Sequence, residues 1–266
     1  MQYMTLNSSC AWTGIANLLE MEGIQKTDRE LILAADLPHQ FGYLEGSWLA
    51  GPMLQGKDWF DLALLPLGYR CDEQQISRKE AVSALKEKLP AMVGLQVAPD
   101  SKHAVICRDY QKGKYYFLNN KWAESAEPDS FILTEKDLTE RLDELVMTIQ
   151  LEKAEKQEVT DLQADRRHRS LEFFARYQKE LTDYIAVPRS VSELRQQLNP
   201  LFRPLLLDGI GMAALAGHEE LAKKLTKLQR SLLDILRGDE KEGHLLSEKM
   251  DELTALLSEY QAMIAG

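Results

Sequence analysis

The chain contains three cysteines, and Cys10 is the one whose surroundings suggest chemistry. It follows the polar segment Asn7-Ser8-Ser9 and begins an apolar-periodic run that extends to Met21. Asn and Ser are favoured at helix N-caps, so the pattern predicts a helix with Cys10 in its first turn. A helix N-terminus lowers the pKa of a thiol, and its free N–H groups can stabilise an oxyanion. The sequence therefore predicts a nucleophile at Cys10, with an inert buried thiol as the alternative.

A thiol nucleophile needs a base, and His103 is the histidine that we assign to this role. It begins a run rich in Val, Ile and Tyr, which predicts a strand over residues 103–110. Lys112-Gly113 then predicts a tight turn into a second strand over residues 114–119. A lone histidine at a strand end is commonly structural, so the assignment depends on its pairing with Cys10.

The second of these strands ends in Asn119-Asn120. An amide at this position can accept a hydrogen bond from the imidazole of His103 and fix its tautomer. We therefore predict a triad of Cys10, His103 and Asn119, with Asn120 as the alternative orienting residue. Asparagine is also a common turn residue, so a role in the turn is the competing interpretation.

Two segments that carry these residues resemble a known family. The nucleophile helix of papain-like cysteine peptidases is similar to residues 7–19, NSSCAWTGIANLL, and their histidine hairpin is similar to residues 103–119. Within that superfamily the chain most resembles double-glycine leader peptidases and acyltransferases of the butirosin-biosynthesis type. The resemblance covers about residues 1–150 and implies a papain-like fold, with Cys10, His103 and Asn119 as the catalytic residues.

Two positions depart from the family pattern. Papain-like enzymes usually carry a glutamine six residues before the cysteine, where its amide helps to form the oxyanion hole, and Met4 occupies that position here. Gln2 and Asn7 are possible substitutes. The pair Asn119-Asn120 stands where the leader peptidases typically have Asp-Pro. A catalytically inactive binding or scaffold protein is therefore the alternative to an enzyme.

The tryptophans and the remaining cysteines have weaker signals. Trp12 lies on the predicted nucleophile helix and could line a substrate pocket, and Trp122 could shield the triad from water, although core packing is the commoner role. Cys71 and Cys107 have neither a helix cap nor a nearby base, so we predict structural roles for them. No His, Cys, Asp and Glu residues have the spacing of a metal site, and we expect no cofactor.

The triad must be positioned by the helices and strands around it. Their predicted order, helices first and an antiparallel sheet after them, indicates an α+β domain over residues 1–153. Thr27 with Glu30 predicts a capping box that opens a second helix. Residues 38–57 are rich in Gly, Pro and aromatic residues and predict a long loop. Further helices are predicted from Trp59 to Leu65, from Lys79 to Lys88 and from Glu135 to Leu142, and further strands from Ala91 to Val97 and from Leu145 to Leu151.

Residues 154–266 predict an all-α domain, a bundle of about four helices. Pro200 and Pro204 must bend or break a helical segment near residues 191–207. The charged stretch 152–158 predicts the boundary between the domains. An open bundle could form a homodimer. The bundle is predicted from two stripes of apolar residues spaced by three and four positions: Leu221, Leu225, Leu228, Leu232 and Ile235, and then Leu246, Met250, Leu253, Leu257, Tyr260 and Ile264.

The composition limits the partners that we expect. The formal net charge is -10, which disfavours nucleic acid and anionic membranes as partners. No stretch approaches the roughly 18 apolar residues of a membrane span, and residues 1–9 lack the layout of a signal peptide. Three cysteines without a CxxC pair suit a reducing cytoplasm. We therefore expect a cytoplasmic protein acting on a peptide, an acyl carrier or a small-molecule acyl substrate.

Overall fold

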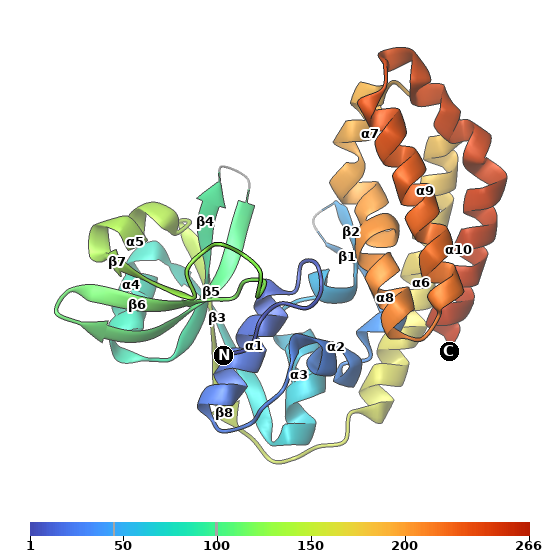
Figure 1. Cartoon of the computed structure of the whole chain (residues 1–266). Coiled ribbons are helices and arrows are strands. Elements are labelled where there is room, and N and C mark those ends of the chain that lie inside the picture. Colours follow the sequence, from blue (N-terminus) through green and yellow to red (C-terminus); the bar gives the residue numbers. More distant parts are fainter. Residues whose placement is uncertain (45, 99–100) are drawn as a thin grey trace. The chain divides into compact units, whose positions relative to one another are not determined.

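The computed structural model describes residues 1–44, 46–98 and 101–266, and these form two compact units of mixed helix and antiparallel sheet (Figure 1). The first unit contains residues 1–35 and 55–159, and the second contains residues 36–54 and 160–266. The segment 36–54, which the sequence analysis placed in the first domain, packs with the helices of the second unit.

A six-stranded sheet forms the framework of the first unit. Its neighbouring strands all pair antiparallel, in the order β3-β8-β4-β5-β6-β7. The predicted hairpin is present, since Lys112 and Gly113 both have the positive φ of a tight turn between β5 and β6. The strands are β3 (Tyr69–Ser77), β4 (Ala91–Ala98), β5 (Ser101–Gln111), β6 (Lys114–Asn119), β7 (Ser130–Thr134) and β8 (Leu145–Lys153).

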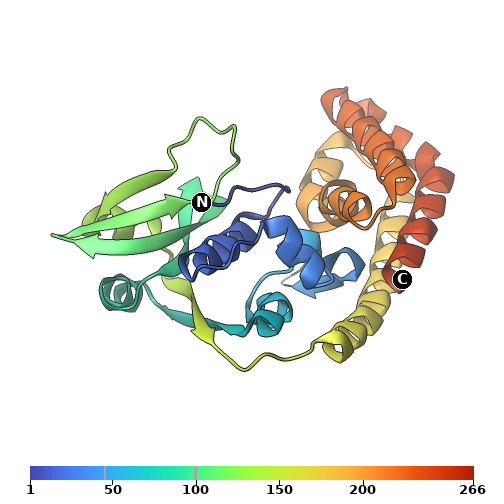
Figure 2. The same cartoon turned by 60° about the horizontal axis from the view of Figure 1, so that its bottom comes forward.

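Helices cover both faces of this sheet (Figure 2). Helices α4 and α5 bury Leu85 and Leu138 against Val93 and other residues of one strand face. Helix α1 packs on the opposite face, so closely that a Cβ on Gly14 would lie 2.1 Å from the sulfur of Met92. The helices of this unit are α1 (Cys10–Met21), α2 (Asp28–Ala34), α3 (Lys57–Leu64), α4 (Arg78–Glu87) and α5 (Glu135–Arg141).

Short local signals fix where these helices begin and end. The predicted capping box at Thr27 is present, and Ser77 and Thr134 open α4 and α5 in the same way. Helix α1 ends at Met21, and Gly23, two residues later, has a left-handed φ of 83° that suits glycine. The N–H groups of Gly23 and Ile24 donate to carbonyls of the last turn, which closes the helix.

Helices dominate the second unit, and the two predicted apolar stripes lie mostly in its buried core. Pro200 and Pro204 fall in two successive π-helical turns, Leu198–Phe202 and Pro204–Asp208, so the helix is interrupted where the sequence predicted. The charged stretch 152–158 begins in the last two residues of β8 and continues without regular secondary structure toward α6, which begins at Thr160. The helices are α6 (Thr160–Ile185), α7 (Val191–Gln196), α8 (Gly209–Leu215), α9 (Glu219–Arg237) and α10 (Met250–Ala265).

Residues 38–57, predicted as a long loop, instead contain a short β-hairpin, which belongs to the segment 36–54 of the second unit. Strands β1 (Phe41–Leu44) and β2 (Ser47–Ala50) pair antiparallel between two short 3₁₀ turns. Phe41 packs edge-on against Phe174 at 5.1 Å between ring centroids, and Trp48 is also buried in the helical core. The strands are only four residues long, so they carry too little alternation to be distinguished from a loop.

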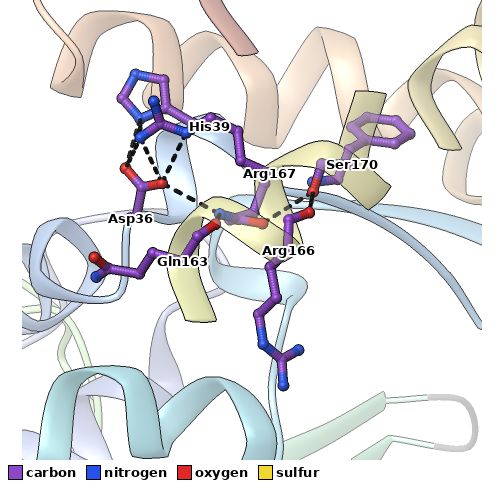
Figure 3. A network of polar contacts seen from close by, with 8 residues as sticks. Asp36, His39, Gln163, Arg166, Arg167 and Ser170 are labelled. Atoms are coloured by element: carbon purple, nitrogen blue, oxygen red, sulfur yellow. Dashed lines mark hydrogen bonds and ion pairs between the residues drawn. The ribbon is translucent and has the colours of Figure 1, made fainter. Parts of the chain in front are cut away.

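A polar network anchors this hairpin to α6 (Figure 3). Arg167 donates from Nη2 to both carboxylate oxygens of Asp36, at 2.7 and 2.8 Å, and Nδ1 of His39 lies 2.7 Å from Asp36 Oδ1. Ser170 accepts a hydrogen bond from the Phe41 N–H at 2.9 Å. Burial raises the pKa of Asp36, but the bonds from His39 and Arg167 outweigh it and hold that pKa below its ordinary value.

The Asp36 carboxylate is expected to stabilise the second unit by about 2 kcal/mol, as a charged hydrogen-bond acceptor in a partly buried site does. Asp36→Asn tests this, because asparagine tolerates the left-handed φ of 61° at this position. A lowered folded-state pKa gives stability that is complete above the unfolded value of about 4 and is lost at lower pH. The variant should therefore be less stable at pH 7 and match the wild type near pH 2.

Hydrogen exchange of α6 amides across this pH range measures the difference. Asp183→Asn is the control, because its carboxylate pairs with Lys179 on the exposed surface of the same helix. Exposed pairs contribute roughly 0.5 kcal/mol or less, so the control should change little. Equal effects of the two substitutions would contradict the structural role of Asp36.

Candidate active site

Cys10 is the first residue of α1, in the helical turn where the sequence placed it. The capping differs from the prediction, because the N-cap residue Ser9 makes no side-chain cap. Its hydroxyl oxygen instead lies 2.8 Å from the carbonyl oxygen of Leu6 and 2.5 Å from the carboxylate of Asp28, so these two acceptors share its single proton. The hydrogen bond between Ser9 and Asp28 therefore fixes the start of helix α1.

Asp28 is a fully buried carboxylate at the first position of α2. Its oxygens accept hydrogen bonds from the N–H and hydroxyl of Thr5 at 2.8 and 2.6 Å, and from the hydroxyls of Ser9 and Thr13. A buried charge is tolerated when several donors surround it. This network ties the segment before Cys10 and the first turn of α1 to α2.

The side chains of His103 and Cys10 interact, since each is among the groups that shift the pKa of the other. The other side of the imidazole faces β6, where Nε2 of His103 lies 2.9 Å from Oδ1 of Asn119. An amide oxygen can only accept, so Nε2 carries a proton and Nδ1 is the nitrogen left for the sulfur. The structure therefore brings together Cys10 of α1, His103 of β5 and Asn119 of β6, with His103 interacting with both of the others.

Electrostatics at this contact favour an ionised pair. Burial alone raises the pKa of the Cys10 thiol, but the hydrogen bond from His103 and the backbone N–H groups of Ala104 and Ala11 outweigh it. The pKa of Cys10 is therefore lowered. Burial lowers the pKa of His103, and its contacts with Cys10 and Asn119 more than compensate, so that pKa is raised. Opposite shifts of the two groups favour thiolate with imidazolium.

The other two cysteines have the opposite environment. Burial raises the pKa of Cys107 to about 12, and it raises the pKa of Cys71 further still. Both thiols are almost completely buried, whereas Cys10 is partly exposed. They are therefore protonated at neutral pH, and Cys10 is the reactive thiol that the structure favours.

Asn120, the alternative orienting residue, points away from the imidazole. It is fully buried, its Nδ2 donates to the carbonyl of Ala104 at 3.0 Å, and its oxygen accepts from Asn17 at 3.1 Å. These bonds tie the end of β6 to β5 and α1. Adjacent residues of a strand point to opposite sides, so only Asn119 of the pair faces His103.

The residues suggested for the oxyanion hole, and Met4 at the position of the family glutamine, make their contacts away from the Cys10–His103 pair or face solvent. Met4 pairs with Trp122 in an isolated parallel bridge, and its N–H donates to the carbonyl of Lys121 at 2.9 Å. Gln2 bonds through its backbone to the side chain of Asn17. Asn7 is exposed. The thioether of Met4 cannot donate a hydrogen bond, so the glutamine amide of the family pattern has no equivalent at this position.

The two tryptophans suggested for a pocket differ from each other. Trp12 has no exposed surface and packs edge-on against Phe60 at 4.8 Å, so it is a core residue and cannot line an open pocket. Trp122 is 38% exposed and follows the asparagine pair. It lies on the segment after β6, where a substrate could contact it.

Sequence reasoning missed two acidic residues around the triad, Asp28 and Glu127. Asp28 was visible only as the residue after a capping Thr27, a position that is usually exposed. Glu127 accepts a hydrogen bond from Nδ2 of Asn119 at 3.2 Å. Asp28 contacts Thr5, Ser9 and Thr13, which lie 15 to 23 positions away, and Glu127 contacts Asn119, eight positions away. Patterns of three or four adjacent residues hold no signal for such contacts.

Comparison with known proteins adds no assignment: no model of a protein family and no curated protein matches the chain. Over residues 1–44, 46–98 and 101–266, no three His, Cys, Asp or Glu side chains are grouped so that they could hold a metal ion. Within the same described ranges, every helix is too short or too polar to span a membrane. The case for a function therefore depends on the geometry around Cys10.

Proposed function

We propose that this protein is a thiol-dependent acyl-bond enzyme, a papain-like cysteine peptidase, amidase or acyltransferase. The observation that carries the proposal is the imidazole of His103, which bonds to Cys10 at a helix N-terminus and to Asn119 on the next strand. A nucleophile, a base and a residue that orients the base are the three parts of this type of catalysis. The order of the residues and their elements also agrees with the papain-like resemblance.

The reaction divides into two acyl transfers. The Cys10 thiolate attacks the carbonyl carbon of the acyl donor, and the resulting oxyanion accepts a hydrogen bond from the N–H of Cys10 at the start of α1. The imidazolium of His103 gives its Nδ1 proton to the leaving group as the carbon–leaving-group bond breaks. A thioester on Cys10 and neutral His103 remain.

The second transfer restores the enzyme. Neutral His103 accepts a proton from water or an amine as that nucleophile attacks the thioester carbonyl. The carbon–sulfur bond then breaks and the thiolate of Cys10 is released beside imidazolium. Water as the acceptor makes the protein a hydrolase, whereas an amine makes it an acyltransferase. Throughout both steps Asn119 holds the Nε2–H side of the ring.

An activated ester tests the proposal without knowledge of the natural substrate. With p-nitrophenyl acetate we expect a burst of about one equivalent of p-nitrophenol per chain, and an intact mass increased by one acetyl group. Cys10→Ala should lose both signals. Cys107→Ala, which removes a buried thiol of raised pKa, should keep both.

The alternative of an inactive binding or scaffold protein is favoured by one observation, the presence of Met4 where the family has its oxyanion-hole glutamine. The two hypotheses differ in the outcome of the ester experiment. Acetylation of Cys10→Ala at the wild-type rate, or no burst from the wild type, would reject the enzyme proposal and favour the binding protein.

A further inference from the structure

The segment that connects β6 to β7 brings a carboxylate to the far side of the triad. Nδ2 of Asn119 donates to Oε2 of Glu127 at 3.2 Å and to the carbonyl of Pro128 at 3.2 Å. These two acceptors fix the amide with its nitrogen toward the segment and its oxygen toward His103. An amide turned the other way would place a donor against the Nε2–H of the ring and lose both bonds.

Internal bonds hold this segment in shape. Lys121 is nearly buried and donates from Nζ to the carbonyl of Ser125 at 3.0 Å, and it pairs with Asp129 at 3.0 Å. The N–H of Asn119 donates to the carbonyl of Asp129 at 2.9 Å. Glu127 donates its own N–H to the hydroxyl of Ser125 at 3.3 Å. The carboxylate therefore sits beside Asn119 because the segment is folded there.

The other charged groups around the pair are engaged elsewhere. Asp28 is enclosed by hydroxyl and N–H donors beneath the start of α1, and Lys102, the neighbour of His103 on β5, pairs with Asp143. Lys121 and Asp129 neutralise each other. Cys10 and Glu127 both raise the pKa of His103 through their negative charge.

We propose that Glu127 is a positioning residue, which holds the Asn119 amide and favours the protonated form of His103 through its negative charge. This inference rests on the proposed thiol chemistry, because it assigns a fourth member to that triad. Among the influences on His103, burial lowers its pKa, while the contacts with Cys10 and Asn119 and the charge of Glu127 raise it. Glu127 acts on the imidazole through its charge and through its hydrogen bond with Asn119, so we assign it a positioning role and not a catalytic one.

Glu127→Gln separates charge from hydrogen bonding, because the glutamine oxygen can still accept from Asn119. The measurement is the titration of His103 by NMR of histidine-labelled protein, with the resonance assigned by its absence in His103→Ala. We expect the midpoint to fall by about 0.5 pH unit at low salt and by less at high salt, since Glu127 is solvent-exposed. A purely structural role would not depend on salt in this way.

Two further variants complete the test. Glu124→Gln removes the same charge from the same segment and should leave the His103 midpoint close to that of the wild type. Glu127→Asp keeps the negative charge, so His103 should titrate with a midpoint close to that of the wild type. This result would show that the shift in Glu127→Gln comes from the lost charge and not from altered folding. Equal shifts for Glu124→Gln and Glu127→Gln, or no shift for either, would overturn the role of Glu127.

These outcomes are distinct from a failure of the proposed function. If His103 titrates with a raised midpoint that falls in Cys10→Ala, the thiol–imidazole pair stands, whatever Glu127→Gln does. If the wild-type midpoint is ordinary and does not respond to Cys10→Ala, the pair is absent and both proposals are rejected.

Discussion

Replacing His103 with alanine is expected to slow alkylation of Cys10 by iodoacetamide at pH 7 by at least about tenfold. The bond from His103 is the largest influence that lowers the pKa of Cys10, and without it the burial of the sulfur acts in the opposite direction. An ordinary thiol, with a pKa of about 8.5, is only about 3% ionised at pH 7. A thiolate of higher pKa is intrinsically more nucleophilic, which offsets part of the loss.

The pH dependence makes this prediction specific. Between pH 5 and pH 7 the wild-type rate should rise less steeply with pH than the rate of His103→Ala, which should rise nearly tenfold for each pH unit. His168→Ala, an exposed histidine that pairs with Glu172 on α6, is the matched control and should behave like the wild type. Peptide mass spectrometry locates the label. Parallel pH profiles for the wild type and His103→Ala would contradict the paired thiol.

The second large effect is expected from Asp28→Ala, which should destabilise the first unit by about 3 kcal/mol. The substitution removes the carboxylate that accepts from the buried Thr13 hydroxyl, removes one of the two acceptors of the buried Ser9 hydroxyl, and frees the N–H of Thr5. Each buried donor left without a partner costs roughly 1–3 kcal/mol, and rotation of the hydroxyls to other acceptors recovers part of this. Amide exchange of α1 and α2 measures the change in local stability.

Asp161→Ala is the control for this substitution. Asp161 also lies in the first turn of a helix, α6, but it is exposed. Loss of its interaction with the helix dipole costs at most about 1 kcal/mol. The destabilisation of Asp28→Ala beyond that of Asp161→Ala therefore measures the contribution of the buried hydrogen bonds to stability. Slower alkylation of Cys10 in Asp28→Ala would show that the network also orients the nucleophile. A destabilisation no greater than that of Asp161→Ala would contradict the role of Asp28 in holding α1.

Much of the first unit could be predicted because its signals are local. The capping box at Thr27, the glycine that ends α1 and the Lys112-Gly113 turn each depend on a few adjacent residues, and all three are present. Strands β3 and β7 were not predicted. The first is largely polar and the second has five residues, so neither shows the alternation of a half-buried strand.

In the candidate active site, too, features set by adjacent residues could be predicted, and features set by contacts between segments could not. The positions of Cys10 at a helix start and of His103 on a strand follow from short patterns. Whether Asn119 or Asn120 faces the ring depends on the register between β5 and β6, which sequence alone leaves open. The carboxylates of Asp28 and Glu127 come from other segments, and the burial of Trp12 depends on Phe60. These features are products of packing.

The most direct test of the thiolate–imidazolium pair is the ultraviolet absorbance of the Cys10 thiolate, taken as the difference between the wild type and Cys10→Ala as pH is lowered. The paired geometry predicts an absorbance step whose midpoint lies clearly below the ordinary thiol value of about 8.5. A midpoint at or above that value would mean that Cys10 is an ordinary buried thiol, and the proposed acyl chemistry would lose its nucleophile.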